Sequence, residues 1–124
     1  MGVRVIDCEP DFFPALRAAV AAGRYPPGTE GHWLRADIGG LETEDEFVLA
    51  TDADILFLRD IDLSDVRPAR AAYAAEFDPA DTAAFNGGVA VVNAAAARRD
   101  RAAYADHIRA KLAEPGWFLE RDAA

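Results

Sequence analysis

The feature that most constrains this chain is the apolar run at residues 47–58, which two aspartates interrupt one residue apart. Residues 47–50 predict a buried strand, and residues 55–58 predict a second short one. Burying a carboxylate without a partner is costly, so we expect Asp52 and Asp54 to lie at the mouth of the strand, where a cation can bind. Open α/β sheets place their ligands at that edge.

The composition fits one acidic domain. A chain of 124 residues has room for a single domain, residues 1–124, with one core. The net charge of −9 argues against non-specific nucleic-acid binding and suits a site for a divalent cation. The single cysteine, Cys8, permits no internal disulfide and fits a reducing cytoplasm. No apolar run approaches the ~20 residues of a membrane span, so we expect a cytoplasmic protein without a transmembrane segment.

Short apolar strands alternate with helical patterns along the chain. Besides the central pair, we expect strands at residues 3–8, 69–76 and 89–92, and helices at residues 12–22, 32–40 and 94–113. Asp11 and Asn93 are the expected N-caps of the first and last helices. This alternation predicts a single-domain α/β fold with a mostly parallel sheet flanked by helices.

Two short motifs could carry chemistry. Hard divalent cations prefer oxygen ligands, so Asp52 and Asp54 at a strand end fit a metal–diphosphate site. A solvated acidic turn is the alternative interpretation. In the second motif, Asn86 offers a donor and an acceptor, and Gly87 and Gly88 allow a ligand to approach the backbone closely. A tight turn leading into a strand explains these glycines equally well.

Together, these residues resemble a known family. Residues 49–60 are similar to the LYLDADILVLRDL segment of nucleotide-sugar glycosyltransferases of the GT-A fold. The similarity is greatest to family 8, the glycogenin-like and bacterial galactosyl- and glucosyltransferase group. Residues 85–93 resemble that family's FNSGV motif and the apolar strand and Asn that follow it. Residues 33–35 resemble its aromatic–Arg–Leu stretch and residues 120–123 its DQDAL stretch, so the resemblance covers residues 30–124.

The resemblance implies the core of a GT-A fold and metal-dependent glycosyl transfer. The donor would be a nucleotide-diphospho-sugar, with a UDP-sugar as the expected form, and the acceptor a saccharide or another molecule. Asp52 and Asp54 would hold Mn²⁺ or Mg²⁺ and, through it, the diphosphate. The metal would stabilise the leaving nucleoside diphosphate as the glycosidic bond breaks.

The resemblance also implies roles for residues outside the aspartate pair. Asn86, Gly87 and Gly88 would line the sugar pocket. Arg35 would approach the diphosphate, where a planar guanidinium can bind two oxygens. Asp122 would match the acidic catalytic residue near the reacting sugar and acceptor, although an ordinary charge near the chain end is the alternative.

The chain departs from the family pattern at both ends. Residues 3–8 do not supply the family's first nucleotide-binding strand, and no C-terminal motif with the third metal ligand, a histidine, follows. His32 and His107 stand in other contexts, and we expect them to be surface or packing residues. The chain therefore resembles a shortened or partial catalytic domain.

Two rival functions remain open at this point. A non-catalytic or remnant nucleotide-sugar-binding domain would keep the aspartate pair without performing transfer. A haloacid-dehalogenase-like phosphatase would use Asp52 as nucleophile and Asp54 as general acid, but it also needs a downstream lysine and a paired acidic motif. Lys111 is the one lysine of the chain and lies within the last predicted helix. The sequence leaves the donor sugar, the acceptor, the stereochemical course and the oligomeric state open.

Overall fold

The hydrophobic core lies where α1 (Phe13–Ala21) packs against the C-terminal half of α3 (Ala94–Ala113). The structure is a computed structural model that describes residues 5–28, 30–75 and 85–114. Leu16 of α1 is completely buried in this core, together with Ile108 and Leu112 of α3. Apolar residues at helical spacing bury one face of each helix, which is why the periodicity predicts both helices. Both predictions are confirmed, and α3 has the predicted boundaries.

The two predicted helix caps have opposite outcomes. Asn93 caps α3 as predicted, since its Oδ1 accepts a hydrogen bond from the Ala96 backbone N–H at 2.8 Å. The prediction that Asp11 caps α1 is wrong, because the N-cap is Phe12 and no side chain caps that end. Pro14 lies in the first turn of α1, where a missing backbone N–H costs little.

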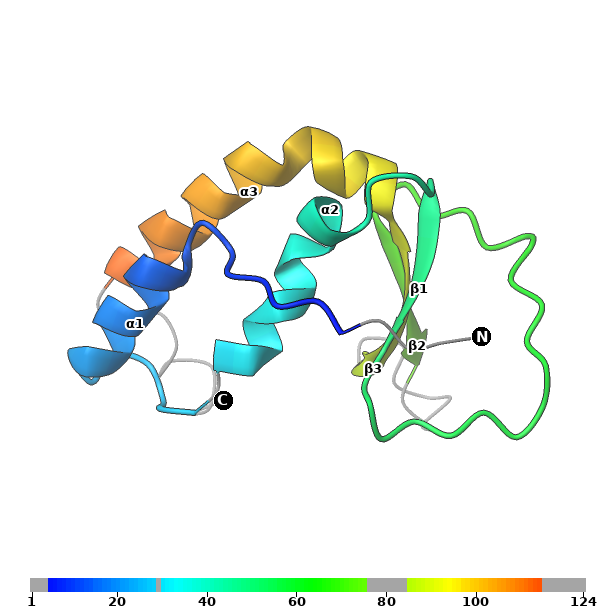
Figure 1. The fold of residues 1–124 in the computed structure, drawn as a ribbon, viewed down its shortest axis with the longest axis horizontal. Coiled ribbons are helices and arrows are strands. Elements are labelled where there is room, and N and C mark those ends of the chain that lie inside the picture. Colours follow the sequence, from blue (N-terminus) through cyan, green and yellow to red (C-terminus); the bar gives the residue numbers. More distant parts are fainter. Residues whose placement is uncertain (1–4, 29, 76–84, 115–124) are drawn as a thin grey trace.

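A 3-10 helix, η1 (Glu30–Asp37), continues into the short helix α2 (Ile38–Leu41) and lies between α1 and the sheet (Figure 1). Trp33 of η1 packs edge-on against Phe12 and donates its indole N–H to the Tyr25 hydroxyl at 2.6 Å. A Cβ at Gly39 would lie 2.6 Å from the Ala97 carbonyl carbon, so α2 touches the α3 backbone directly. The helical segment predicted at residues 32–40 is thereby confirmed, with a largely 3-10 geometry.

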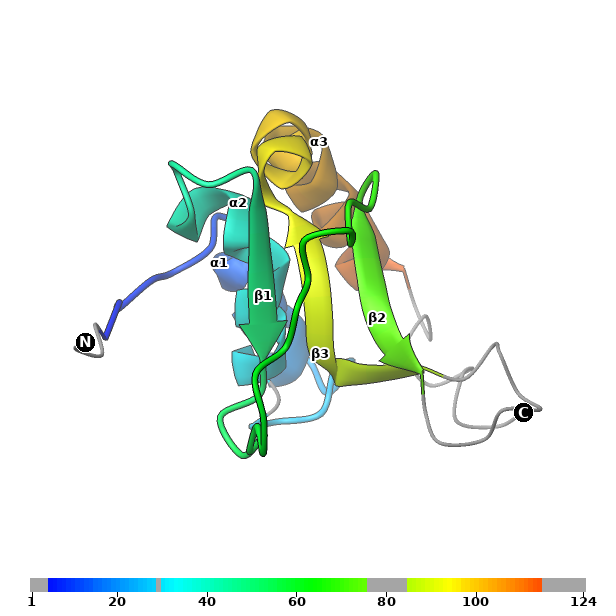
Figure 2. The same ribbon diagram turned by 90° about the vertical axis from the view of Figure 1, so that its right-hand side faces the viewer.

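The sheet contains β1 (Phe47–Thr51), β2 (Ala71–Ala75) and β3 (Phe85–Asn93) in the order β1-β3-β2, and both pairs are antiparallel. Figure 2 shows β3 between its two neighbours, with the helices on one side of the sheet. The predicted mostly parallel sheet and the GT-A core are therefore wrong. Residues 52–70 connect β1 to β2 without a helix, and β3 lies between these two strands and pairs antiparallel with both. β1 and β2 run in the same direction, but β3 separates them.

Two other predicted strands are absent from the described residues. Residues 55–58 belong to an irregular loop that swings away from the sheet (Figure 1), where Leu56 is 79% and Leu58 88% exposed. The apolar composition of this segment predicts burial, but no neighbouring strand edge pairs with it in the described sheet. Residues 5–8 are also irregular, and Val5 is exposed. The loop predicted at residues 77–84 lies outside the described residues.

Charged residues interrupt α3 in nearly every turn, including Arg98, Arg101 and Asp106. Within the part of the chain that the structure describes, no helix combines the length and apolar character that a membrane crossing requires.

Candidate functional site

The antiparallel register of the sheet brings the two sequence motifs together. Thr51 at the end of β1 pairs with Val89 of β3, and the Asp52 backbone N–H donates to the Gly88 carbonyl oxygen at 2.8 Å. The first aspartate of the pair therefore lies beside the two glycines. The same antiparallel pairing that overturns the predicted fold creates this proximity.

The glycines lie inside β3, at an irregularity of the sheet, and not in a turn before it. Tyr73 of β2 pairs with Ala90 and Ala74 with Asn86, so residues 87–89 have no pairing partner in β2. Such bulges favour glycine because its backbone tolerates the distortion. A Cβ at Gly87 would lie 2.9 Å from Nη1 of Arg35. The group that closely approaches the backbone of Gly87 in this structure is therefore the Arg35 side chain and not a ligand.

Arg35 joins the two motifs. Its Nη2 donates to Oδ1 of Asp52 at 2.5 Å, and its Nη1 donates to the Gly87 carbonyl oxygen. The Arg35 and Asp52 side chains are 42% and 44% exposed, so this ion pair contributes little to stability and remains accessible to ligands. We refer to Arg35, Asp52, Gly87 and Gly88 as the Arg35 cluster.

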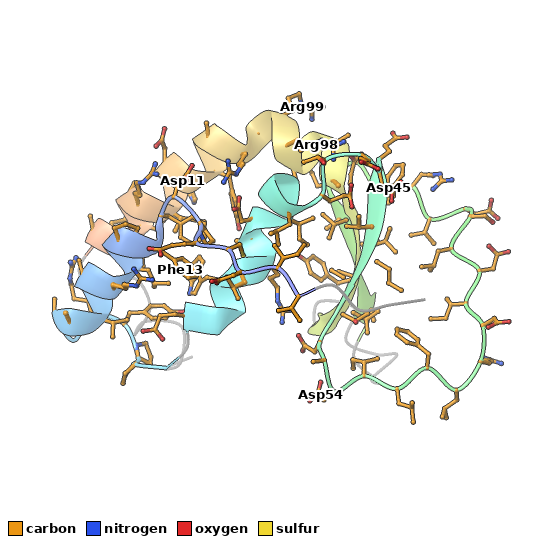
Figure 3. All side chains as sticks on the ribbon, in the orientation of Figure 1. Asp11, Phe13, Asp45, Asp54, Arg98 and Arg99 are labelled. Carbon is orange, nitrogen blue, oxygen red and sulfur yellow. The ribbon has the colours of Figure 1, made fainter. Side chains whose placement is uncertain are left out.

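The structure separates the other predicted site residues from this cluster. Figure 3 shows Asp54 in the loop beyond β1, with its exposed side chain pointing away from the sheet. Asn86 belongs to β3, but its side chain and Asp122 lie outside what the structure describes. Among the described residues, no three side chains of histidine, cysteine, aspartate or glutamate gather to form a metal site. The structure thus brings together Arg35, Asp52 and the two glycines, and leaves Asp54 apart.

A cavity of about 830 Å³ lies between the sheet, η1 and α3. Arg35 lines this cavity and therefore connects the cavity to the Arg35 cluster. A second, smaller cavity of about 70 Å³ reaches Thr51 and Gly87 and shares Arg35, Ile38, Tyr73 and Val92 with the larger one. Small-molecule sites usually have volumes of roughly 300–1,000 Å³. The larger cavity is therefore of a size that holds a small ligand, with the cluster at one side.

Sequence reasoning missed the aromatic character of this cavity. Four aromatic side chains line it: Tyr25 from the loop after α1, Trp33 from η1, Tyr73 from β2 and Tyr104 from α3. Tyr104 follows the apolar spacing of α3 and is therefore predicted as a core residue, yet about half of it is exposed. His107, predicted to be a surface or packing residue, is exposed and also lines the cavity. The signal in the sequence was Tyr104, a tyrosine on a face of α3 that otherwise carries aliphatic side chains.

The tyrosine of β2 affects the titration of the tyrosine of α3. Burial raises the pKa of Tyr104, and the nearby Tyr73 adds to this shift. Both rings line the cavity from opposite elements, Tyr73 from the sheet and Tyr104 from the helix. The charged side chains in the wall of the cavity are Arg35, which binds Asp52, and the ion pair of Arg70 with Asp100.

No protein-family model matches the chain, and no curated protein or solved structure is significantly similar to it. A functional assignment therefore depends on the residues of the Arg35 cluster and of the cavity beside it.

Proposed function

We propose that this protein binds a nucleotide-diphospho-sugar, such as a UDP-sugar, at the Arg35 cluster and transfers its glycosyl group to an acceptor. The observation that carries the proposal is the arrangement of Arg35, which binds both Asp52 and the Gly87 carbonyl oxygen. The two motifs that resemble those of glycosyltransferases are thus in direct contact, beside a cavity of about 830 Å³. The proposal concerns the site chemistry and does not depend on a GT-A core.

Arg35 is suited to hold the diphosphate. A guanidinium presents several N–H groups in one plane, and its geometry matches two phosphate oxygens. The bonds to Asp52 and Gly87 leave further N–H groups of Arg35 for a ligand, and the side chain is partly exposed. A Cβ at Gly87 would lie 2.9 Å from Nη1 of Arg35, so glycine lets the guanidinium rest directly against β3. An incoming diphosphate would therefore meet a positioned cation.

The donor set fits a divalent cation only when the substrate supplies ligands too. Mg²⁺ commonly takes one or two carboxylates and completes its shell with phosphate oxygens and water. Asp52 and Asp54 are the residues that would hold Mn²⁺ or Mg²⁺; both side chains are accessible to solvent, and Asp54, which points away from the sheet, would have to turn toward Asp52. When bound, the cation supplies charge stabilisation to the leaving nucleoside diphosphate. Asp52 would help to hold the cation, and Arg35, which lies beside Asp52, would bind the diphosphate.

The catalytic step itself rests on the sequence resemblance. Asp122 is proposed as the acidic residue near the reacting sugar, and Asn86 as a ligand of that sugar. A non-catalytic nucleotide-sugar-binding domain is the second candidate function. One observation favours it: the described residues include no third protein ligand for a metal near Asp52.

Calorimetric titration of the full chain with UDP, with and without Mn²⁺, tests the binding part of the proposal. We expect Mn²⁺ to tighten binding, Asp54→Ala to abolish that effect without unfolding the chain, and Arg35→Gln to weaken binding in both conditions. Arg59→Gln is the matched control, because Arg59 is an exposed arginine of the loop that carries Asp54. Absence of UDP binding to the unmodified chain in both conditions would refute the proposal.

Release of UDP from UDP-glucose and UDP-galactose then separates the two candidate functions. Metal-dependent release that Asp122→Asn abolishes supports glycosyl transfer. Binding without release, with a range of saccharide acceptors present, supports the non-catalytic domain.

A further inference from the structure

The larger cavity has walls that suit a flat ring. Tyr73 of β2 is 48% exposed and Tyr104 of α3 is 49% exposed, and both line the cavity. Aromatic side chains in a core are normally buried, whereas about half of the surface of each of these two residues is exposed. Trp33 and Tyr25 close the cavity on the side of η1, where they are bonded to each other and packed into the core.

The cavity and the Arg35 cluster form one continuous site. Arg35 and Tyr73 line both the larger cavity and the smaller one that reaches Gly87. A ligand with an anionic group at Arg35 would therefore extend its remaining part toward Tyr73 and Tyr104. The lining of this site therefore combines the Arg35 cation and the Arg70–Asp100 ion pair with the aromatic surface of Tyr73 and Tyr104.

We infer that this cavity holds the nucleobase of a nucleoside diphosphate, stacked against Tyr73 and Tyr104, while the diphosphate lies at Arg35. The inference that the ligand carries a diphosphate rests on the proposed function. The inference that it carries a nucleobase rests on the aromatic lining of the cavity. A nucleobase fits because every base has a flat π-face that stacks on aromatic side chains. The Asn93 side chain caps α3 and binds the Pro68 carbonyl oxygen, so it is committed to the fold, whereas His107 and Arg70 lie at the wall where the edge of a base could find hydrogen-bond partners.

Two probes that share the diphosphate but differ in the base test this inference. Affinities for UDP and for inorganic pyrophosphate are measured by calorimetry in the presence of Mg²⁺. We expect Tyr73→Leu and Tyr104→Leu each to weaken UDP binding by roughly fivefold or more, as for loss of one stacking contact, and to leave pyrophosphate binding unchanged. Arg35→Gln should weaken the binding of both probes. Tyr73→Phe and Tyr104→Phe are the matched controls, because they keep the ring and should retain UDP binding.

A measurement on the unmodified protein removes any dependence on how the variants fold. Stacking shifts the ring-proton resonances of a tyrosine, so UDP should shift those of Tyr73 and Tyr104 in NMR spectra, and pyrophosphate should not. Unchanged UDP affinity in both leucine variants, or equal loss for UDP and pyrophosphate, would overturn the inference and leave the proposed function standing. Failure of the unmodified chain to bind either probe would overturn both.

Discussion

Arg101 binds both carboxylate oxygens of Asp37, with Nε 2.6 Å from Oδ1 and Nη2 3.1 Å from Oδ2. Asp37 is buried at the junction of η1 and α2, so this pair ties that junction to α3. Hydrogen bonding to Asp37, together with its charge, raises the pKa of Arg101. The pair spans 64 residues of sequence and fixes the helical connection that carries Arg35.

Replacing Arg101 with glutamine should destabilise the fold strongly, because it leaves the buried Asp37 carboxylate without its charged partner. Loss of one partner of a fully buried pair costs about 3–5 kcal/mol, and we expect about 2 kcal/mol here because Arg101 itself is partly exposed. Urea unfolding measures this loss. Arg17→Gln is the control, since the Arg17–Glu9 pair is exposed on both sides and should contribute less than about 0.5 kcal/mol. Equal losses in the two variants would contradict the role of Arg101.

Gly39→Ala should destabilise the contact between α2 and α3. The added methyl group would lie 2.6 Å from backbone atoms of Ala97 and Arg98, which cannot move aside without shifting α3. Overpacking of this kind costs about 1–3 kcal/mol, measurable as a lower midpoint in thermal or urea unfolding. Gly31→Ala is the matched control, because nothing lies within 4 Å of its added Cβ. A stability of Gly39→Ala equal to that of Gly31→Ala would show that the two helices do not touch there.

Asn93→Ala should lower the free energy of unfolding by about 1 kcal/mol, because it removes the N-cap of α3. The same change removes the bond from Nδ2 to the Pro68 carbonyl oxygen at 3.2 Å. Asn93→Asp separates the two contributions, since it keeps an acceptor for the Ala96 N–H and adds favourable negative charge at a helix N-terminus. Aspartate should therefore recover most of the stability; a loss as large as that of alanine would assign the effect to Pro68.

Glu42 should make stability dependent on pH in the acidic range. Hydrogen bonds from the backbone N–H groups of Asp45 and Glu44 lower the pKa of Glu42, and Arg98 adds to the effect. A carboxyl whose pKa is lowered by folding stabilises the protein above its unfolded pKa of 4.5, and this contribution is lost as pH falls through the lower folded value. Glu42→Gln should therefore be less stable than the unmodified chain at neutral pH, and the difference should shrink on acidification.

Thermal unfolding between neutral and strongly acidic pH measures the effect of Glu42→Gln. Glu44→Gln is the control, because its side chain accepts neither of these backbone bonds. A difference between the unmodified chain and Glu42→Gln that stays constant across the pH range would contradict the prediction.

Local patterns predicted most of the regular elements. The boundaries of α3 follow from Asn93, whose side chain caps the helix, and from the apolar spacing of Ile108 and Leu112. β1 and β3 follow from compact apolar runs, and α1 from the helical spacing of Phe12, Leu16 and Val20. The same criteria failed at residues 55–58, because an apolar run predicts burial but cannot supply a neighbouring strand edge.

The site was predictable in part. The sequence resemblance named Arg35, Asp52, Gly87 and Gly88, and the structure brings these four together. It also named Asp54, which points away from the sheet (Figure 3). The sequence could not predict the aromatic walls of the cavity, because Tyr73 and Tyr104 line the same cavity only after β2 and α3 have packed in the folded protein.

The sequence by itself determined most of the segments that become helices and strands, since capping, periodicity and apolar runs act over a few residues. Only the tertiary structure decided the direction and order of the strands. Apolar runs read the same in parallel and antiparallel sheets, and the insertion of β3 between β1 and β2 depends on which backbone hydrogen-bonding edges meet. That insertion sets Asp52 opposite Gly88, within reach of Arg35, and so creates the cluster at which we propose that a ligand binds.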